Sequence, residues 1–309
     1  RLPDVPAAAE RMLRDLSESW RARATVIEAL DECREPAAVD LLIAMIESER
    51  APRLVGDILI ALYSLTGRTL PADAYVWRSW WNANRASFRI SPQRLQVWEI
   101  PRDGGSTTAP TFYGIEVRTN QVCFVLDISG SMSIEAQFVP TGIPAPTHEG
   151  PLNRLDVAKF ELMRVLTQVV ETERARPLER STRSRTAPGV FTLVFFDDRV
   201  DVWRVTLQPA IGPAIDEARQ TISDLQPRGG TNIYDALVAA MNVPNVDTIF
   251  LLSDGAPGHG TFTAPADILR EIGRDNRDRR IIIHTIMIGG HSPFMQQLAQ
   301  QNGGQYVFR

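Results

Sequence analysis

Three short oxygen-bearing side chains follow a buried apolar run in "FVLDISGSM", residues 124–132. Asp127, Ser129 and Ser131 are separated by single residues, and a glycine lies between the two serines. Asp and Ser are common in turns and at helix N-caps, so this stretch alone is compatible with a simple turn. The same side chains also offer a carboxylate and two hydroxyls, which are oxygen ligands that suit a hard divalent cation. The stretch is therefore a candidate half of a metal site.

Two later segments carry side chains of the same kind. "PRGGTNIYDAL" places Thr231 after Gly229 and Gly230, and "IFLLSDGAPGHG" ends a predicted strand with Asp254 and Gly255. In an open parallel sheet the loops at the carboxyl ends of the strands meet at one crevice, so we expect the three segments to converge. Their two carboxylates attract Mg²⁺ or Mn²⁺, and the neutral hydroxyls leave such an ion with affinity for a further anion.

The elements that must position these loops alternate between strands and helices from about residue 118. Expected strands are 121–127, 190–197, 200–207, 247–254, 280–289 and 304–309, and expected helices begin near Arg154, Pro213, Ile233, Pro265 and Ser292. Several strands are continuously apolar, which indicates burial on both faces of a mostly parallel sheet. Only "DDR" separates the second strand from the third, so that pair is expected to be an antiparallel hairpin at an edge. The sequence predicts an α/β fold with a Rossmann-like, doubly wound, six-stranded sheet.

The first ninety residues have a different, purely helical pattern. Segments beginning at Trp20, Pro36 and Pro52 carry apolar residues at three- and four-residue spacing, and the third ends at Gly67. Helices of this length joined by tight turns resemble short HEAT or armadillo-type repeats. We therefore expect a smaller all-α domain over residues 1–90.

An aromatic segment and a linker follow these helices. "YVWRSWWNANRASF" places Trp77, Trp80 and Trp81 on one helical face, where we interpret them as aromatics that close the end of the helical array. Residues 91–117 are rich in Pro, Gly, Ser and Thr and are expected to link the helical domain to a second domain, residues 118–309.

The segment from residue 118 to 309 resembles the von Willebrand factor A domain family. That family's metal-ion-dependent adhesion site has the form D-x-S-x-S, followed by a distant Thr and a distant Asp, and these occur here as "DISGS", "GGT" and "LLSDG". The segments "RLDVAKFEL", "TNIYDAL" and "FMQQLAQQNGGQYVF" also match the family. Because all three motifs occur in order and on the expected elements, the combination is far more specific than D-x-S-x-S alone.

The resemblance implies a binding function and assigns roles to particular residues. Ser129, Ser131 and Thr231 would ligate one Mg²⁺ (or Mn²⁺) directly or alternately. Asp127 and Asp254 would act through water or by direct contact, depending on the state of the site. One open position on the ion would accept an Asp or Glu side chain of a partner protein. The residues expected on the partner-binding rim are Gly130, Gly230, Phe138, Glu149 and Gly255.

Residues 133–154 form a longer connection than family members usually have between D-x-S-x-S and the next helix. Its four prolines limit the backbone and remove hydrogen-bond donors, so we expect an irregular loop. Phe138 and Ile143 are apolar residues that a solvated loop does not need, and Glu149 is a potential metal ligand. We hypothesise that this loop forms a wall of the partner-binding surface or covers the ion until a partner arrives.

Composition and spacing argue against other classes of function. A net charge of −4, and 12 Arg against 13 acidic residues in positions 1–90, offer no basic face for nucleic acid. The four histidines, at 148, 259, 284 and 291, lack zinc-ligand spacing, although His259 and His291 are expected near the rim of the site. We recognise no serine with a base and an oxyanion site, so the chain is not expected to be an enzyme.

Two alternatives stay open at this stage. One is an RNA-binding protein of the Ro type, which also joins helical repeats to an A domain, and the other is an adaptor subunit of an ATPase or chelatase machine. No apolar run reaches the roughly 20 residues of a membrane span. The chain begins at Arg1 without a methionine, which favours an extracytoplasmic protein after signal-peptide removal and leaves a cytoplasmic one open.

Overall fold

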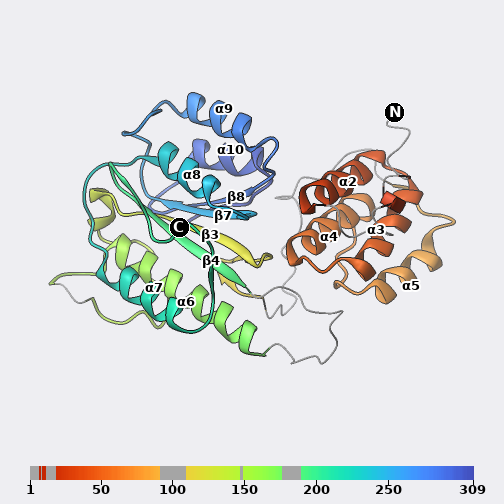
Figure 1. The fold of residues 1–309 in the computed structure, drawn as a ribbon, viewed down its shortest axis with the longest axis horizontal. Helices are drawn as coiled ribbons and strands as arrows, with labels where there is room; N and C mark the ends of the chain where they lie inside the picture. Colours follow the sequence, from red (N-terminus) through yellow and green to blue (C-terminus); the bar gives the residue numbers. More distant parts are fainter. Residues whose placement is uncertain (1–6, 8, 12–18, 91–108, 147–148, 176–188) are drawn as a thin grey trace. The chain divides into compact units, whose positions relative to one another are not determined.

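The chain consists of two compact units (Figure 1). The structure is a computed structural model, and it describes residues 7, 9–11, 19–90, 109–146, 149–175 and 189–309. Among these residues no helix is both long and apolar enough to cross a membrane. Of the expected linker, residues 91–108 lie outside the described residues.

The first unit is helical, as the apolar spacing predicts. It contains α2 (Trp20–Cys33), α3 (Pro36–Ser48), α4 (Pro52–Thr66) and α5 (Ala74–Asn84). Proline occupies the first turn of α3 and α4, where its missing N–H costs nothing, and Gly67 ends α4 with a φ of 66°. The apolar faces of the four helices share one core. A HEAT-type repeat relation among them stays a prediction.

The aromatic segment of α5 closes this helical core, in agreement with the sequence interpretation. Trp77 and Trp81 are each only 1% exposed, whereas Trp80 is partly buried and packs on both. The indole N–H of Trp81 donates to Asp40 Oδ1 of α3 at 2.8 Å, so its one polar atom is satisfied inside the helical unit.

The second unit is a twisted sheet with helices on both faces (Figure 1). Its strands are β3 (Gln121–Asp127), β4 (Val190–Phe196), β5 (Val200–Val202), β6 (Gln208–Pro209), β7 (Thr248–Ser253), β8 (Ile282–Met287) and β9 (Tyr306–Phe308). The strand order is β5-β4-β3-β7-β8-β9, and β6 pairs with β4. Pairing is parallel along β4-β3-β7-β8-β9 and antiparallel where β5 and β6 meet β4. The predicted antiparallel edge is therefore present.

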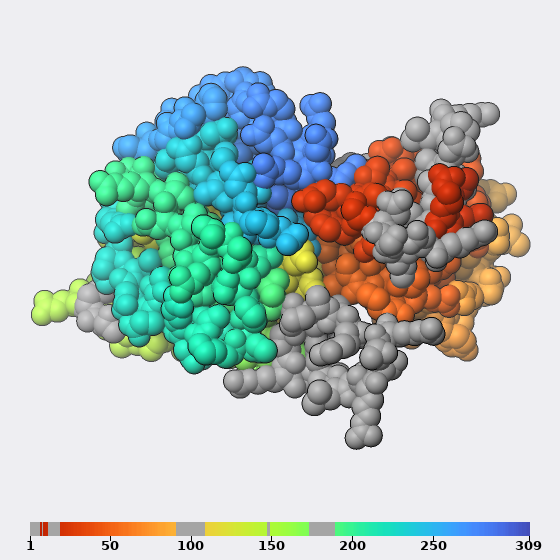
Figure 2. All heavy atoms as spheres, viewed as in Figure 1, coloured from red at the N-terminus to blue at the C-terminus, as the bar shows by residue number. Residues whose placement is uncertain are grey.

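Alternate residues of the central strands supply two separate cores. Phe124 and Leu126 of β3 pack with α6 (Arg154–Ala175) and α7 (Pro213–Asp224), on one face of the sheet. Cys123 and Val125 point to the other face, toward α8 (Ile233–Asn242), α9 (Pro265–Asn276) and α10 (Pro293–Gln301). This two-sided burial explains why β3, β4 and β7 are apolar without alternation. On the face drawn in Figure 2, the teal to blue segments of this unit form one continuous surface.

The sheet differs from the sequence prediction in its small strands. The two-residue strand β6 is a seventh strand where six were expected, and β5 ends at Val202 although a strand to residue 207 was expected. Residues 109–117, expected to belong to the linker, instead contain the hairpin β1 (Thr111–Phe112) and β2 (Ile115–Glu116). This hairpin buries Phe112, Tyr113 and Ile115 in the core beside α6, because their apolar area is too large to leave in a solvated connection.

Candidate functional site

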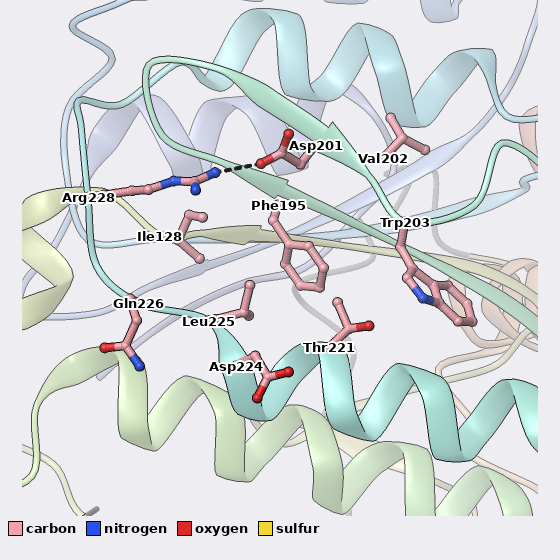
Figure 3. A pocket seen from close by; sticks show the side chains of 10 residues that line it. All are labelled: Ile128, Phe195, Asp201, Val202, Trp203, Thr221, Asp224, Leu225, Gln226 and Arg228. Carbon is pink, nitrogen blue, oxygen red and sulfur yellow. Dashed lines mark hydrogen bonds and ion pairs between the residues drawn. The ribbon is translucent and has the colours of Figure 1, made fainter. Parts of the chain in front are cut away.

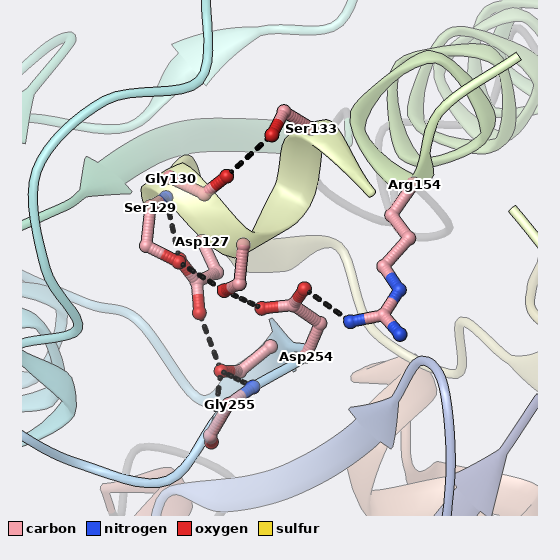
Figure 4. A network of polar contacts seen from close by, with 9 residues as sticks. Asp127, Ser129, Gly130, Ser133, Arg154, Asp254 and Gly255 are labelled. Carbon is pink, nitrogen blue, oxygen red and sulfur yellow. Dashed lines mark hydrogen bonds and ion pairs between the residues drawn. The ribbon is translucent and has the colours of Figure 1, made fainter. Parts of the chain in front are cut away.

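Strand β3 delivers Asp127 to the carboxyl edge of the sheet, where the carboxylate is fully buried. Its Oδ1 accepts the Ser129 backbone N–H at 2.7 Å, and its Oδ2 accepts the Ser253 hydroxyl at 2.5 Å (Figure 4). Burial, with a smaller contribution from the nearby Asp254 carboxylate, raises the pKa of Asp127 to about 6 against the lowering effect of these hydrogen bonds. A buried carboxylate at a sheet edge is costly without a positive partner, which makes this position a candidate site for a cation.

The two serines after β3 lie on a short 3₁₀ turn, η2 (Gly130–Ser133), and at its N-cap. Their hydroxyls are 3.1 Å apart, and Ser131 Oγ also donates to Asp254 Oδ1 at 2.7 Å. Ser131 therefore bridges the loop after β3 and the loop after β7, although the two residues are 123 positions apart in the chain.

Thr231 reaches the same place from the loop that precedes α8. A Cβ atom built on Gly255 would lie 3.4 Å from Thr231 Oγ1 and 3.9 Å from Ser131 Oγ, so both hydroxyls face the same side of that glycine. The backbone N–H of Gly130 donates to Gly229 O at 3.0 Å, which joins the loop after β3 directly to the loop before α8. All five oxygen-bearing residues predicted from the sequence thus lie at one edge of the sheet.

The residues expected on the rim are placed less uniformly. Gly130, Gly230 and Gly255 belong to the three converging loops, and the ring of His259 packs so closely on Gly230 that an added Cβ would lie 2.1 Å from its Nδ1. Phe138 is 44% exposed, and the Arg309 guanidinium lies over its ring at 5.9 Å, which links it to the end of β9. Glu149 is exposed, and its place on a rim stays a prediction.

The irregular character of the inserted loop agrees with its proline content. Residues 134–146 and 149–153 contain no helix and only an isolated bridge between Glu135 and Asn153. Backbone hydrogen bonds from Ala136 N to Leu152 O and from Arg154 N to Ile134 O, each 2.9 Å, close the base of the loop. Residues 147 and 148 lie outside the described residues.

Arg154 is a residue of the site to which the sequence analysis assigned no role. It is the first residue of α6, and its Nη1 donates to Asp254 Oδ2 at 2.7 Å (Figure 4). The side chains of Arg154 and Asp254 are only 12% and 0% exposed. The available signal was the "RLDVAKFEL" motif, but an arginine at a helix start is usually solvated, and its partner is 100 residues away.

An open cavity of about 470 Å³ lies beside these loops (Figure 3). Its apolar walls include Ile128, which lies between Asp127 and Ser129 in the chain, together with Phe195 and Trp203. The exposed Arg228, which also lines the cavity, pairs with Asp201 Oδ2 at 2.6 Å and with the buried Asp197 Oδ2 at 2.5 Å. Sequence reasoning did not predict this cavity, because its lining comes from four separate segments.

The set of possible metal ligands depends on hydroxyls rather than on a dense acidic cluster. Within the described ranges, no group of three or more His, Cys, Asp or Glu side chains is placed to hold a metal ion. The converging groups are instead two carboxylates and three hydroxyls, which is the composition that the sequence predicted.

Comparisons with known proteins agree with this architecture. The profile of the von Willebrand factor type A domain matches residues 186–308. Von Willebrand factor A domain-containing protein 3A of Homo sapiens is 27% identical over 194 residues, which cover 62% of this chain and 13% of that protein. Inter-alpha-trypsin inhibitor heavy chain H4 of Homo sapiens is 30% identical over 128 residues, which cover 37% of this chain and 14% of that protein. The chain therefore matches only a small part of the length of these relatives.

Two solved structures align with about three fifths of the chain. The von Willebrand factor type A protein from Catenulispora acidiphila aligns with a TM-score of 0.44 at 18% identity, covering 61% of this chain and 38% of that one. The PilB minor pilin from Streptococcus sanguinis aligns with a TM-score of 0.43 at 16% identity, covering 61% and 56%. From the sequence match and the alternating strands and helices of the second unit, we conclude that the chain contains a von Willebrand factor type A domain.

Proposed function

We propose that the second unit binds one Mg²⁺ or Mn²⁺ ion at the carboxyl edge of its sheet and uses it to capture an acidic side chain of a partner protein. The ligands in this proposal are Asp127, Ser129, Ser131, Thr231 and Asp254. The observation that carries it is the position of Ser131 Oγ, which lies within hydrogen-bond distance of both Ser129 Oγ and Asp254 Oδ1.

The spacing of these oxygens supports the fit of a small hard cation. Ligand oxygens at about 2.1 Å from Mg²⁺ in an octahedral shell lie about 3 Å from their neighbours. Ser129 Oγ and Ser131 Oγ are 3.1 Å apart, and Ser131 Oγ and Asp254 Oδ1 are 2.7 Å apart. Small side-chain adjustments would therefore be enough to replace these hydrogen bonds by coordination.

The carboxylates have different parts in this proposal. Both oxygens of Asp127 already accept hydrogen bonds within the protein, so we expect Asp127 to hold the ion through water or with one remaining lone pair. Asp254 Oδ1 faces Ser131 and would contact the ion directly. The ion supplies a compact positive charge to which a carboxylate from outside can bind.

The family relationship supports a binding role over a catalytic one. The second unit is a von Willebrand factor type A domain, a type of domain that serves in protein interaction. A site that leaves its cation under-neutralised is suited to reversible capture of an acidic residue, because attachment and release need no covalent step. We therefore propose a metal-dependent protein-binding module.

The first experiment measures Mn²⁺ binding to the whole chain by the loss of the free-ion signal in electron paramagnetic resonance. We expect one weak site that Mg²⁺ competes for and that Asp127→Asn and Asp254→Asn each abolish. Asp278→Asn, which removes an exposed carboxylate, is the matched control and should leave binding unchanged. Equal Mn²⁺ affinity in all four proteins would overturn the proposed site.

The second experiment tests carboxylate capture with a defined probe. N-acetylglutamate amide should displace water from the protein-bound Mn²⁺ and lower the water-proton relaxation enhancement, whereas N-acetylglutamine amide should not. Equal effects of the two probes would contradict the carboxylate specificity and leave the metal site itself intact.

A further inference from the structure

The position of Arg154 is determined by its backbone and by a glycine from another loop. The backbone N–H of Arg154 donates to Ile134 O at 2.9 Å, which holds the start of α6 against the end of η2. A Cβ on Gly289, which has a φ of 86°, would lie 2.5 Å from Arg154 Nη2. The loop after β8 thus leaves space for the guanidinium in a backbone conformation that favours glycine. The Ile288 N–H donates to Ser253 O at 3.0 Å, which joins this loop to the end of β7.

The carboxylate of Asp254 is shared between two kinds of partner. Its Oδ2 accepts from Arg154 at 2.7 Å, and its Oδ1 accepts from Ser131 at 2.7 Å. Because the Asp254 side chain has no exposed surface, these contacts determine its orientation when no metal is bound. A carboxylate held in this way needs no metal ion to stay in place.

The same ion pair changes the charge of the site. Asp127 and Asp254 together would neutralise a divalent cation, but the guanidinium of Arg154 cancels one of these negative charges. The charge of a loaded site is therefore one unit positive before any partner binds. Because the side chains of Arg154 and Asp254 are little exposed, this excess positive charge is poorly screened by solvent. It therefore weakens binding of the metal ion alone and favours binding of an incoming anion.

We propose that Arg154 is a positioning residue that orients Asp254 and makes firm metal binding depend on an external carboxylate. This inference rests on the proposed function of the site, since it concerns the same ion. The metal and the acidic residue of the partner then bind together more strongly than either does alone. The coupling is reciprocal, because each ligand must raise the affinity of the other by the same factor.

The test compares Arg154→Gln with Arg164→Gln in the whole chain, by calorimetric titration with Mg²⁺. Arg164 is a matched control on the same helix, where its Nη2 pairs with Glu161 Oε2 at 2.6 Å. We expect Arg154→Gln to bind Mg²⁺ at least tenfold more tightly than the wild type and Arg164→Gln to match the wild type. Arg154→Lys keeps the charge and should stay within threefold of the wild type.

A second readout separates a charge effect from a structural one. N-acetylglutamate amide should increase the Mg²⁺ affinity of the wild type and have a smaller effect on Arg154→Gln. A merely structural arginine would give weaker Mg²⁺ binding in the glutamine variant, together with a lower melting temperature in EDTA. Weaker or unchanged Mg²⁺ affinity in Arg154→Gln would therefore overturn the inference.

A measurement on the wild type keeps the inference testable if the glutamine variant does not fold. The ¹⁵Nε–H signal of Arg154 should shift when Mg²⁺ binds, and that of Arg164 should not. An unmoved Arg154 signal in a protein that binds Mg²⁺ would overturn the inference. If the wild type binds neither Mg²⁺ nor Mn²⁺, the proposed function itself fails, and this outcome is distinct from the others.

Discussion

Replacing Asp127 by asparagine should stabilise the metal-free protein, although the same change should abolish metal binding. Burial raises the pKa of this carboxyl from 3.8 to about 6. A carboxyl with a higher pKa in the folded than in the unfolded chain binds its proton more tightly in the folded state. The stabilisation that comes from this tighter proton binding is fully present below pH 3.8 and is lost as the pH rises through about 6. At pH 7 the ionised group therefore destabilises the metal-free fold.

The size of this effect follows from the pKa shift and the local hydrogen bonds. A shift of roughly 2 units corresponds to about 3 kcal/mol at pH 7, which is an upper limit. An amide has one acceptor oxygen, which can still receive the Ser129 N–H, and its NH₂ group would face Ser253 Oγ. The Ser253 hydroxyl can turn to donate to Gly255 O, which lies 3.4 Å away, and can then accept from the amide. We therefore expect a net stabilisation of about 1–3 kcal/mol.

The assay must report on the second unit alone, because the two units need not unfold together. Cys123 of β3 is fully buried, so its alkylation in urea, resolved by peptide mass spectrometry, measures opening of the sheet. In EDTA at pH 7 the Asp127→Asn protein should resist alkylation to a higher urea concentration than the wild type. The difference should nearly vanish at pH 4, and Asp278→Asn should show none. Lower stability of Asp127→Asn at pH 7, or an equal gain at both pH values, would refute the electrostatic reasoning.

Three further predictions concern the metal and the loops around it. EDTA should change the melting temperature of the wild type by only a few degrees, because the buried sheet rather than a weakly bound ion stabilises the fold. Calorimetric scanning would show a larger change if the ion were structural. Ser131→Ala should weaken Mn²⁺ binding at least tenfold, whereas Ser133→Ala, which removes only a hydrogen bond to Gly130 O, should not. Equal losses of Mn²⁺ affinity in the two variants, measured by electron paramagnetic resonance, would contradict the ligand assignment. Replacing residues 136–150 by a short Gly/Ser linker should preserve folding and Mg²⁺ affinity. The same replacement should change the affinity for a partner protein, isolated by Mg²⁺-dependent capture, at least tenfold. Unaltered partner affinity would show that the loop is not part of the partner-binding surface.

Long elements were predictable because their side-chain patterns reflect burial directly. The continuous apolar runs of β3, β4 and β7 exist since both faces of these strands are covered by helices. Strands of two residues, such as those of the β1–β2 hairpin and β6, are too short for any period to be detected. The Gly, Pro and Ser residues around the hairpin favour a linker instead.

The sequence by itself determined the oxygen-bearing groups of the proposed site. The order of D-x-S-x-S, Thr231 and Asp254 on the expected elements indicates oxygen ligands at one sheet edge, because parallel strands bring the loops after them together. It also predicted a helix beginning near Arg154, and α6 begins at that residue.

Only the tertiary structure decided the electrostatic state of those groups. The pKa of Asp127 depends on how completely the sheet and its loops exclude water from it, and a motif does not specify that burial. The pairing of Arg154 with Asp254 depends on the space beside Gly289 and joins residues 100 positions apart. Local patterns record which side chains are present, whereas charge and desolvation depend on distances across the whole fold, and these distances set the strength of every interaction at the site.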